Sequence, residues 1–572
     1  MKKIITLLIT ILVFMVTNAQ DVKFEWAKQM GGTDYGLGYS IITDATGNIY
    51  TTGLFSGTTD FDPSENSFNL TSVGNSDIFI SKMDSSGNLL WAKQIGGLDY
   101  EYAIFIDRDK NENLYITGNF RGNVDFNPGL GVNNLTAIGA SDSFVVKLDN
   151  SGNFLWAKQF GGTGNYITGH SLDLDSQGNV YITGDFTGTV DFDPSTGIHN
   201  LTSAGSNDIY IAKLNSIGNL VWAKRIGSYS GDEGVDIKVD TSGDYLYVTG
   251  AFRGTVDFNP DSAIFNLASS GSRDIYILKL ASSGSFVWAK KIGDTGADRG
   301  HEIALDNSNN HIYITGEFSG NPDFDPGTGS FNLSSAGGQD CFVEKLDMSG
   351  NFVWARAMGG PAGEEPGNSI KLDSSGNVIV TGWFWGTSDF DPSIGNYYLT
   401  SQGSSDVFIV KLNPEGTFVW AKHFGGADEE VYVSSWSSAL DTSDNIFTTG
   451  GFEGGEVDFD PGANTYNLSP LGNGDIFIHK MSADNLGINE NNPGNNFKIY
   501  PNPTSGPLVL ELKGNVAHYS ISLINQLGQI IPTDIIRKSN RFELNFNGKS
   551  GLYFLKITNT KGLTKYLKVL KK

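Results

Sequence analysis

Pairs of acidic residues recur along the chain in a four-residue motif, Asp-Phe-Asp-Pro or Asp-Phe-Asn-Pro, whose oxygen atoms could bind a metal ion. In an extended segment, acids separated by one residue lie on the same side of the backbone, and Ca²⁺ takes about six to eight oxygen ligands. The predicted candidate ligands are Asp60, Asp62, Asp191, Asp193, Asp323 and Asp325. The alternative is a turn in which the Asp side chain caps its own backbone and Pro fixes φ. Two carboxylates are too few for a Ca²⁺ site, which favours the turn, and no other cofactor is predicted.

Aromatic residues that stand outside the repeated motifs are candidates for ligand binding. Seven of the ten tryptophans belong to a repeated triplet, Trp-Ala-Lys, and the other three do not. Aromatic rings offer an apolar face to a sugar ring, and neighbouring polar groups can fix its hydroxyls. The predicted ligand-binding residues are Trp383, Trp385, Trp436, Tyr35 and Tyr100. The alternative is that these rings fill the core locally, because Trp is highly buried on average.

Signatures of common enzyme classes are missing from the sequence. It has no Gly-x-Ser-x-Gly, no His-Glu-x-x-His and no phosphate-binding glycine loop. The seven histidines are interpreted as occupying non-equivalent places in the repeats, without a cluster along the chain. These observations favour a binding or scaffold module for a carbohydrate or protein ligand. Two alternatives stay open: an extracellular glycan hydrolase or lyase that uses carboxylates, and a purely structural surface protein.

The triplet Trp-Ala-Lys, once Trp-Ala-Arg, recurs every 65 or 66 residues and predicts the architecture. Between consecutive triplets lie short runs of β-branched and aromatic residues bounded by Gly, Asn, Asp or Ser, which are typical of strands. In the second repeat the predicted strands are 102–107, 113–119, 142–148 and 153–159. Four antiparallel strands repeated seven times predict an all-β fold, a seven-bladed β-propeller. The repeated Trp is expected to pack between neighbouring blades.

The first and last repeats are both incomplete, and each has the strands that the other lacks. The last repeat has three predicted strands, up to about residue 481, and no Trp-Ala-Lys strand follows them. The first Trp-Ala-Lys strand, 24–30, has no partner strands before it. We therefore expect the N-terminal strand to complete the last blade and close the ring, because closure removes exposed sheet edges. The propeller is predicted to span 21–482, with any binding site on the face that carries the long connections, such as 121–141.

The order of motifs within one repeat is similar to that of a known family of bacterial propellers. Each copy reads Gly-Gly, then Gly-Asn-hydrophobic-Tyr-hydrophobic-Thr-Gly, Asp-Phe-x-Pro, Asp-x-Phe-x-x-Lys-Leu and Ser-Gly-Asn, with small variations. This pattern resembles the SBBP type of seven-bladed β-propeller repeat over about 24–481. The resemblance implies the fold and leaves the activity open, because propellers host many functions.

The N-terminus and the charge of the chain predict an exported protein. Lys2 and Lys3 precede an apolar run, 4–16, and a small residue, Ala19, so 1–19 is predicted to be a secretory signal peptide. The run is shorter than the ~20 residues that span a bilayer, and no transmembrane segment is predicted. Residues 21–496 hold 25 Lys and Arg against 60 Asp and Glu, which argues against nucleic acid as a partner.

The C-terminal region differs from the repeats in its composition. Residues 483–496, rich in Asn and Gly, are predicted to be a linker. Residues 497–572 hold 12 Lys and Arg against 3 Asp and Glu, and alternating strand-like segments predict a small β-sandwich. The motif Tyr500-Pro501-Asn502-Pro503, the Gly-Leu-Tyr-Phe run at 551–554 and the basic end make this segment similar to the type A sorting domain of the type IX secretion system of Bacteroidetes.

That resemblance carries its own expectations about destination and partners. It implies that the type IX secretion machinery handles the C-terminal domain after Sec export to the periplasm. It also implies a final location that is extracellular or at the outer-membrane cell surface.

Overall fold

A computed structural model of the chain describes residues 22–163, 166–361, 363–483, 497–501, 504–512, 519–525, 529–538, 541–559 and 564–572. The predicted signal peptide, the predicted linker after Ala483, and Asn502 and Pro503 of the predicted sorting motif lie outside the described residues. Every regular element in the described part is a β-strand, which confirms the all-β prediction. Over the same residues, no helix is long and apolar enough to cross a membrane. The chain divides into two compact units, the first of which ends at Ala483.

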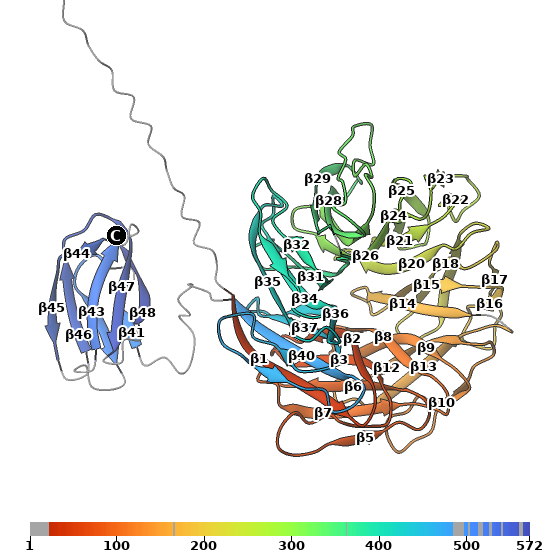
Figure 1. Cartoon of the computed structure of the whole chain (residues 1–572), viewed down its shortest axis with the longest axis horizontal. Coiled ribbons are helices and arrows are strands. Elements are labelled where there is room, and N and C mark those ends of the chain that lie inside the picture. The colour runs from red at the N-terminus through yellow and green to blue at the C-terminus, as the bar shows by residue number, and fades with distance from the viewer. Residues whose placement is uncertain are drawn as a thin grey trace, which may run out of the picture. The chain divides into compact units, whose positions relative to one another are not determined.

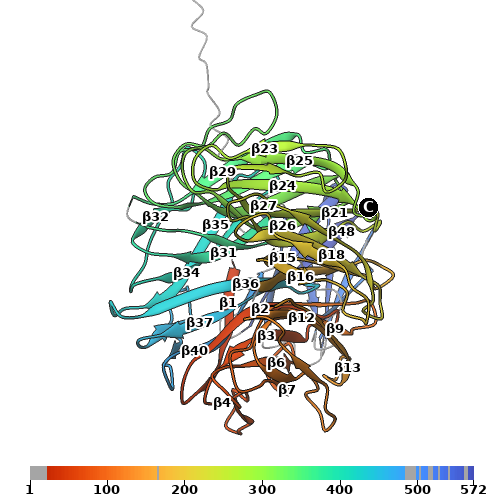
Figure 2. The same cartoon turned by 90° about the vertical axis from the view of Figure 1, so that its right-hand side faces the viewer.

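The first unit is built around groups of four antiparallel strands, each mainly from one repeat; in two sheets a hairpin extends the group to six strands. Their first strands are β2 (Gly36–Thr43), β8 (Tyr102–Arg108), β14 (Ile167–Leu174), β20 (Glu233–Val239), β26 (Arg299–Asp306), β30 (Gly367–Leu372) and β36 (Tyr432–Leu440). Their second strands are β3 (Ile49–Phe55), β9 (Leu114–Phe120), β15 (Val180–Phe186), β21 (Tyr245–Phe252), β27 (His311–Phe318), β31 (Val378–Phe384) and β37 (Ile446–Glu453). Figure 1 shows the first strands gathered around a common centre, and Figure 2 shows the same unit turned by 90°.

The outer half of each sheet holds the strands that carry the most regular motifs. The third strands are β6 (Asp77–Met83), β12 (Asp142–Leu148), β18 (Asp208–Leu214), β24 (Asp274–Ala281), β28 (Asp340–Asp347), β34 (Asp406–Leu412) and β40 (Asp475–Ala483). The fourth strands, which contain the Trp-Ala-Lys triplet, are β7 (Leu89–Ile95), β13 (Phe154–Phe160), β19 (Leu220–Ile226), β25 (Phe286–Ile292), β29 (Phe352–Met358), β35 (Phe418–Gly426) and β1 (Val22–Gly32). The four strands predicted for the second repeat match β8, β9, β12 and β13 to within one residue at each end.

The repeated tryptophan packs at the junction of two sheets, as predicted. The ring of Trp91 on β7 lies 6.3 Å from the ring of Tyr50 on β3 of the same sheet. Both belong to an apolar cluster that also contains Ile106 and Ile116 of the next sheet. Lys82 Nζ lies 4.8 Å from the centre of the Tyr50 ring, so the lysine stem covers this apolar surface. Each sheet therefore buries its face against its neighbour.

The long connection between the second and third strands is a small hairpin rather than an irregular loop. The hairpin strands are β4 (Thr58–Asp60), β5 (Asn69–Thr71), β10 (Asn123–Asp125), β11 (Asn134–Thr136), β16 (Thr189–Asp191), β17 (Asn200–Thr202), β22 (Thr255–Asp257), β23 (Asn266–Ala268), β32 (Thr387–Asp389), β33 (Tyr398–Thr400), β38 (Val457–Asp458) and β39 (Asn467–Leu468). Several hairpins pair with the end of the fourth strand of the preceding sheet, as in Gly425↔Asp458 and Gly161↔Asp191. The hairpins thus link neighbouring sheets and cover their outer edges.

The N-terminal strand lies in the sheet of the last repeat. Strand β1 pairs with β40 in antiparallel register, for example Met30↔Ile476, and also with hairpin strand β4 of the first repeat. Lys480 Nζ donates to the Ser85 carbonyl at 2.9 Å, which joins the last repeat to the first. The first strands β36 and β2 are also in contact.

The second unit has two four-stranded sheets with one shared apolar core. The first sheet has the order β41 (Phe497–Tyr500), β42 (Leu508–Leu512), β46 (Arg541–Phe546) and β45 (Thr533–Arg537). The second has the order β44 (Ile530–Ile531), β43 (Tyr519–Asn525), β47 (Gly551–Asn559) and β48 (Thr564–Lys571). Leu510 and Phe542 of the first sheet are buried in one cluster with Leu523 and Leu555 of the second. This is the layout of a β-sandwich.

Candidate functional site

A β-bulge at the same position of every first strand creates the candidate site. In all seven sheets the pairing between the first and second strands skips one residue. A bulged residue leaves the ladder, and bulges often re-aim a side chain beside functional sites. The seven skipped residues are Tyr39, Ile104, His170, Val235, His301, Asn368 and Trp436. All of them line one cavity of about 480 Å³, at the starts of the first strands.

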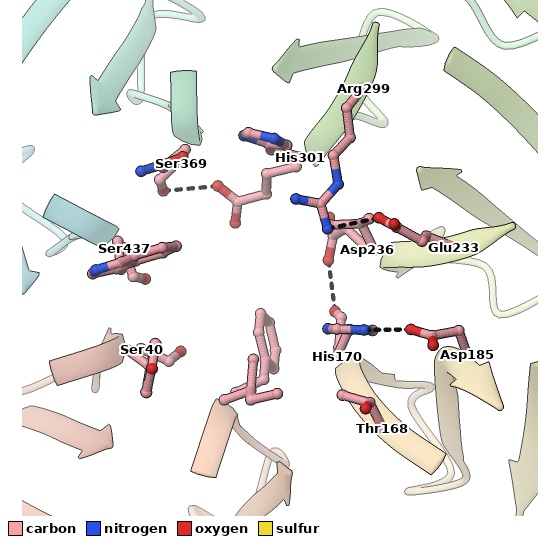
Figure 3. Close-up of a pocket in the computed structure, with 18 of the residues that line it drawn as sticks. Ser40, Thr168, His170, Asp185, Glu233, Asp236, Arg299, His301, Ser369 and Ser437 are labelled. Carbon is pink, nitrogen blue, oxygen red and sulfur yellow. Dashed lines mark hydrogen bonds and ion pairs between the residues drawn. The ribbon is translucent and has the colours of Figure 1, made fainter. Parts of the chain in front are cut away.

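The residue that follows each bulge also lines the cavity. These residues are Ser40, Phe105, Ser171, Asp236, Glu302, Ser369 and Ser437. Figure 3 shows members of both sets projecting toward one space from strands of different sheets. The repeated backbone therefore presents different chemistry from each repeat to a single cavity, at the ends of the strands where the long connections arrive. The volume lies in the range of about 300–1,000 Å³ that is typical of small-molecule sites.

One wall of the cavity is aromatic. The ring of Tyr39 lies 5.7 Å from that of Trp436 in an edge arrangement and 6.4 Å from that of Tyr102. Trp436 is 42% exposed, and Tyr166 continues the wall. Burial raises the pKa of Tyr39 to about 12, so its phenol stays protonated and can donate a hydrogen bond. This wall combines flat apolar faces with hydroxyl donors.

The opposite wall is polar and ordered by a histidine–aspartate contact and an ion pair. His170 Nε2 lies 2.7 Å from Asp185 Oδ1, and Arg299 Nη2 lies 3.0 Å from Glu233 Oε2, as Figure 3 shows. Burial, with Arg299 and Arg273 nearby, lowers the pKa of His301 to about 3. The imidazole of His301 is therefore neutral at ordinary pH, and its buried Nε2 has no hydrogen-bond partner in the described part of the chain. The wall presents fixed donors and acceptors toward the aromatic side.

Charged side chains form the floor of the cavity. Asp236 accepts hydrogen bonds from Ser171 Oγ at 2.6 Å and from the Ile303 backbone N–H at 2.8 Å. Glu302 accepts one from Ser369 Oγ at 2.7 Å and pairs with Lys371 Nζ at 2.5 Å. Each of these bonds crosses from one sheet to the next, so the floor also ties the sheets together.

A second cavity of about 410 Å³ lies next to this floor and shares residues with it. Asp107 and Asp173 line this second cavity side by side, with Lys238 nearby. Burial, together with the adjacent Asp107, raises the pKa of Asp173, so the carboxyl pair retains a proton into the neutral range. Burial would raise the pKa of Glu302 as well, but Lys371 and Lys238 outweigh it and hold that pKa below its ordinary value.

The aromatic residues predicted as binding residues do not come together. Trp436 lines the cavity, whereas Trp383, Trp385, Tyr35 and Tyr100 do not. Trp383 is half-buried on β31, and Trp385 follows that strand with 47% of its surface exposed. Tyr35 forms a bridge to Gly474 of the last repeat, and Tyr100 forms the equivalent bridge to Ser76. The two tyrosines thus lie at junctions between sheets, and their role in ligand binding stays a prediction.

The interpretation of the histidines is wrong for two of them. His170 and His301 both occupy the bulge position of a first strand, so they are equivalent in the repeat and line the same cavity. A signal for the site was present in the sequence. The residue after the Gly, Ala or Ser that opens each bulge differs in nearly every repeat, while the flanking motifs hardly change.

The Asp-Phe-Asp-Pro motifs have the geometry of capped turns. Asp60 Oδ1 accepts the backbone N–H groups of Asp62 at 3.0 Å and Phe68 at 2.7 Å, which closes the β4–β5 hairpin. The first Asp of every other copy makes the same two bonds. Within the described ranges, no group of three or more His, Cys, Asp or Glu side chains could hold a metal ion. No such cluster in the described part of the chain therefore supports Ca²⁺ binding by these residues, which stays a prediction.

Replacing the capping acid tests the two interpretations of this motif. We expect Asp60→Ala to lower the free energy of unfolding by about 1–3 kcal/mol, because two backbone donors lose a charged acceptor. Asp62→Ala should cost less, because Asp62 Oδ1 accepts only the Ser64 N–H. Thermal melts with Ca²⁺ and with EDTA should coincide. A rise in melting temperature with Ca²⁺ that Asp60→Ala abolishes would support the metal site instead.

Comparisons with known families agree with both resemblances seen in the sequence. The model described as "Secretion system C-terminal sorting domain" matches residues 498–572. The model described as "Beta-propeller repeat" matches residues 155–188 and 287–321. The sorting domain implies export to the cell surface or the extracellular space and an interaction with the secretion machinery.

The curated relatives are longer proteins. A WD repeat-containing protein of Acanthamoeba polyphaga mimivirus, named as uncharacterized, is 25% identical over 77% of this chain and 37% of its own length. The regulatory protein FlaEY of Caulobacter vibrioides is 23% identical over 71% of this chain and 42% of its own length. The chain therefore spans about two fifths of each of these relatives.

Solved structures resemble the chain only distantly. A protein of unknown function from Bacteroides caccae is 10% identical, with a TM-score of 0.27 over 59% of this chain and 91% of that one. A member of the DUF4221 family from Bacteroides vulgatus is 8% identical, with a TM-score of 0.28 over 81% of this chain and 98% of that one. These scores are too low to carry an argument. The chain carries repeats of the SBBP β-propeller family and, over residues 498–572, a secretion-system C-terminal sorting domain.

Proposed function

We propose that this protein is exported by the type IX secretion system and binds glycans in the cavity at the centre of its repeat domain. The single observation that carries the proposal is the set of seven bulges, which bring seven side chains of six types to one cavity. Repeated motifs keep the scaffold constant, whereas the bulge position carries Tyr, Ile, His, Val, Asn or Trp in the different repeats. Variation at positions that share one cavity supports a role in ligand binding.

The proposed scaffold is a closed seven-bladed propeller over 21–482, followed by a linker, 483–496, and the sorting domain, 497–572. Pairing of β1 with β40, the bond from Lys480 to Ser85 and the contact between β36 and β2 support a closed ring. Closure holds the seven bulges in a circle and fixes their mutual distances. The predicted signal peptide, 1–19, would deliver the chain to the periplasm before the type IX step.

Glycan is the ligand class that the two walls favour. The aromatic wall, with Tyr39, Tyr102 and Trp436, offers flat faces for the C–H surface of sugar rings. The polar wall, with Glu233, Arg299 and neutral His301, offers acceptors and donors for hydroxyl groups. Sites of this kind use mostly apolar walls for affinity and a few placed polar groups for orientation. A protein ligand remains the second candidate, since long connections surround the mouth of the cavity.

Two tryptophans of similar exposure give a matched test of the site. Binding of the purified exported chain to a polysaccharide panel is measured by calorimetry for the parent chain, Trp436→Ala and Trp385→Ala. We expect Trp436→Ala to weaken binding roughly 30-fold or more, as for a buried aromatic hot spot. Trp385→Ala should bind like the parent chain, because Trp385 lies outside the cavity.

The other outcomes of this test also decide between sites. Loss of binding in Trp385→Ala alone would place the ligand near Trp385, outside the cavity, and contradict the cavity site. Binding to none of the polysaccharides would contradict the glycan proposal and turn the search to protein partners.

A further inference from the structure

We infer that the cavity takes the end of a glycan chain, one terminus entering along the axis of the ring, and does not bind an internal stretch of the polymer. The inference rests on the proposed function and adds to it the part of the glycan that is recognised. It follows from how the cavity is bounded at its sides and its floor.

The sides of the cavity are closed all around. Its lining includes residues of all seven first strands, from β2 to β36, so that no side lies open as a groove. An internal segment of a polysaccharide needs a cleft that is open at both ends, because the chain must continue in both directions. A surrounded cavity with its mouth at one face admits a chain only through that mouth. Figure 3 shows the labelled side chains converging on this space from several directions.

Contacts across the floor narrow the passage to the second cavity. Lys238 Nζ lies 4.8 Å from the centre of the Phe105 ring and 3.4 Å from Asp236 Oδ1, which joins strands of the second and fourth repeats. Glu302 closes the side of the fifth and sixth repeats through its contacts with Ser369 and Lys371. Opening such a floor would separate these charged side chains from their partners. On the side of the first and seventh repeats, the two cavities share Ser40 and Ser437. A glycan chain is inferred to end at this level.

Polar atoms near the floor suit the extra hydroxyl of a terminal sugar. A terminal residue carries a free hydroxyl where an internal residue carries a glycosidic bond. His301 Nε2 is buried and makes no geometric hydrogen bond in the described residues, although it lies 4.0 Å from Glu317 Oε1, and the neutral ring can donate or accept. Asn368 occupies the bulge of the next sheet and also lines the cavity; its Nδ2 donates to the Ser435 carbonyl at 2.9 Å. We assign these two side chains to recognition of the chain end.

Partial hydrolysis of a bound polysaccharide tests the inference, because it multiplies chain ends at constant mass. Each polysaccharide of the panel that binds the full exported chain is titrated intact and after acid hydrolysis that shortens it roughly tenfold. If the protein binds chain ends, the mass concentration of polysaccharide that gives half-saturation should fall roughly tenfold, because the number of ends per unit mass rises roughly tenfold. The stoichiometry should approach one protein per chain.

The outcomes separate this inference from the proposed function. An unchanged or higher midpoint after hydrolysis, with many proteins bound per chain, overturns the end-on inference and leaves glycan binding intact. Absence of binding to intact and hydrolysed material alike means that the proposed function itself has failed.

A histidine pair provides the matched variants. His301→Ala should weaken binding of the hydrolysed material roughly tenfold, as expected for one lost hydrogen bond in a partly buried site. His311→Ala removes a histidine on β27 that does not line the cavity, and it should bind like the parent chain. Equal binding by both variants would overturn the assignment of His301.

Discussion

Deletion of residues 22–32 is expected to abolish folding of the repeat domain. Without β1, strand β40 keeps β37 on one edge but loses its antiparallel partner on the other, and the buried side chain of Met30 leaves the junction between the last and first sheets. An open ring also exposes two sheet edges that invite aggregation. The loss should rival the total stability of a typical domain, about 5–15 kcal/mol.

Solubility and thermal melting check this expectation directly. The deletion variant should be insoluble or lack a cooperative transition, whereas a chain that begins at Asp21 and keeps β1 should melt like the full exported chain. Adding a synthetic peptide of residues 22–32 should restore part of the soluble fraction, since the strand pairs through its backbone. A deletion variant that melts cooperatively at the parent temperature would contradict closure of the ring by β1.

Replacing Glu344 with Val is expected to stabilise the protein by about 1–3 kcal/mol, because a buried carboxyl group without hydrogen-bond partners is costly. Glu344 on β28 is fully buried, and neither carboxyl oxygen has a hydrogen-bond partner in the part of the chain that the structure describes. Its cross-strand neighbours are Ile314 and Ala355, both in an apolar cluster. Val146 and Val410 occupy the equivalent position in other repeats, so valine fits this backbone.

The effect should depend on pH with a definite sign. Burial, and then Asp325, raises the pKa of Glu344 well above its ordinary value in the folded state. The folded protein therefore binds a proton that the unfolded chain releases, and stability is highest below pH ~4.5 and falls as pH rises. The gain from Glu344→Val should thus be larger at pH 8 than at pH 4.5.

Denaturant unfolding at the two pH values measures this difference. Glu344→Gln serves as the matched control, because it removes the titration but keeps a buried polar group. It should flatten the pH dependence with a smaller gain in stability at low pH than Glu344→Val. An equal loss of stability with pH in the parent chain and in Glu344→Val would contradict this assignment.

Most of the repeat fold was predictable because its signals are local and recur. Alternating apolar residues and Gly-Asn turns indicated the strands. Because the motifs recur at the same spacing, each repeat supported the strand assignment of the others. The hairpin within 121–141 was missed because its strands are three residues each, too short to show alternation. Its pairing partner, Gly96, lies in another sheet, which no local pattern reveals.

The candidate site was only partly predictable, for a geometric reason. Trp436 stood out because it breaks the repeat, but Trp385 breaks it too and lies outside the cavity. What decides the difference is the bulge, a backbone irregularity that turns one residue of the first strand out of the ladder. A prediction that assumes strict alternation along the first strand would assign His170 and His301 to a face of the sheet without taking the bulge into account. Side chains at the bulges could have been found by comparing the repeats position by position.

Chemical blocking of the cavity is the most direct test of the central claim, that the ligand lies inside the ring. The only native cysteine, Cys341, is buried, so a cysteine introduced by Asn368→Cys would react selectively with a bulky maleimide. The same label on Asp244→Cys, at an exposed hairpin outside the cavity, controls for the chemistry. We predict that the label at position 368 abolishes binding to the panel polysaccharide, well beyond any weakening in unlabelled Asn368→Cys, while the label at 244 leaves it unchanged. Full binding with position 368 labelled would contradict the account.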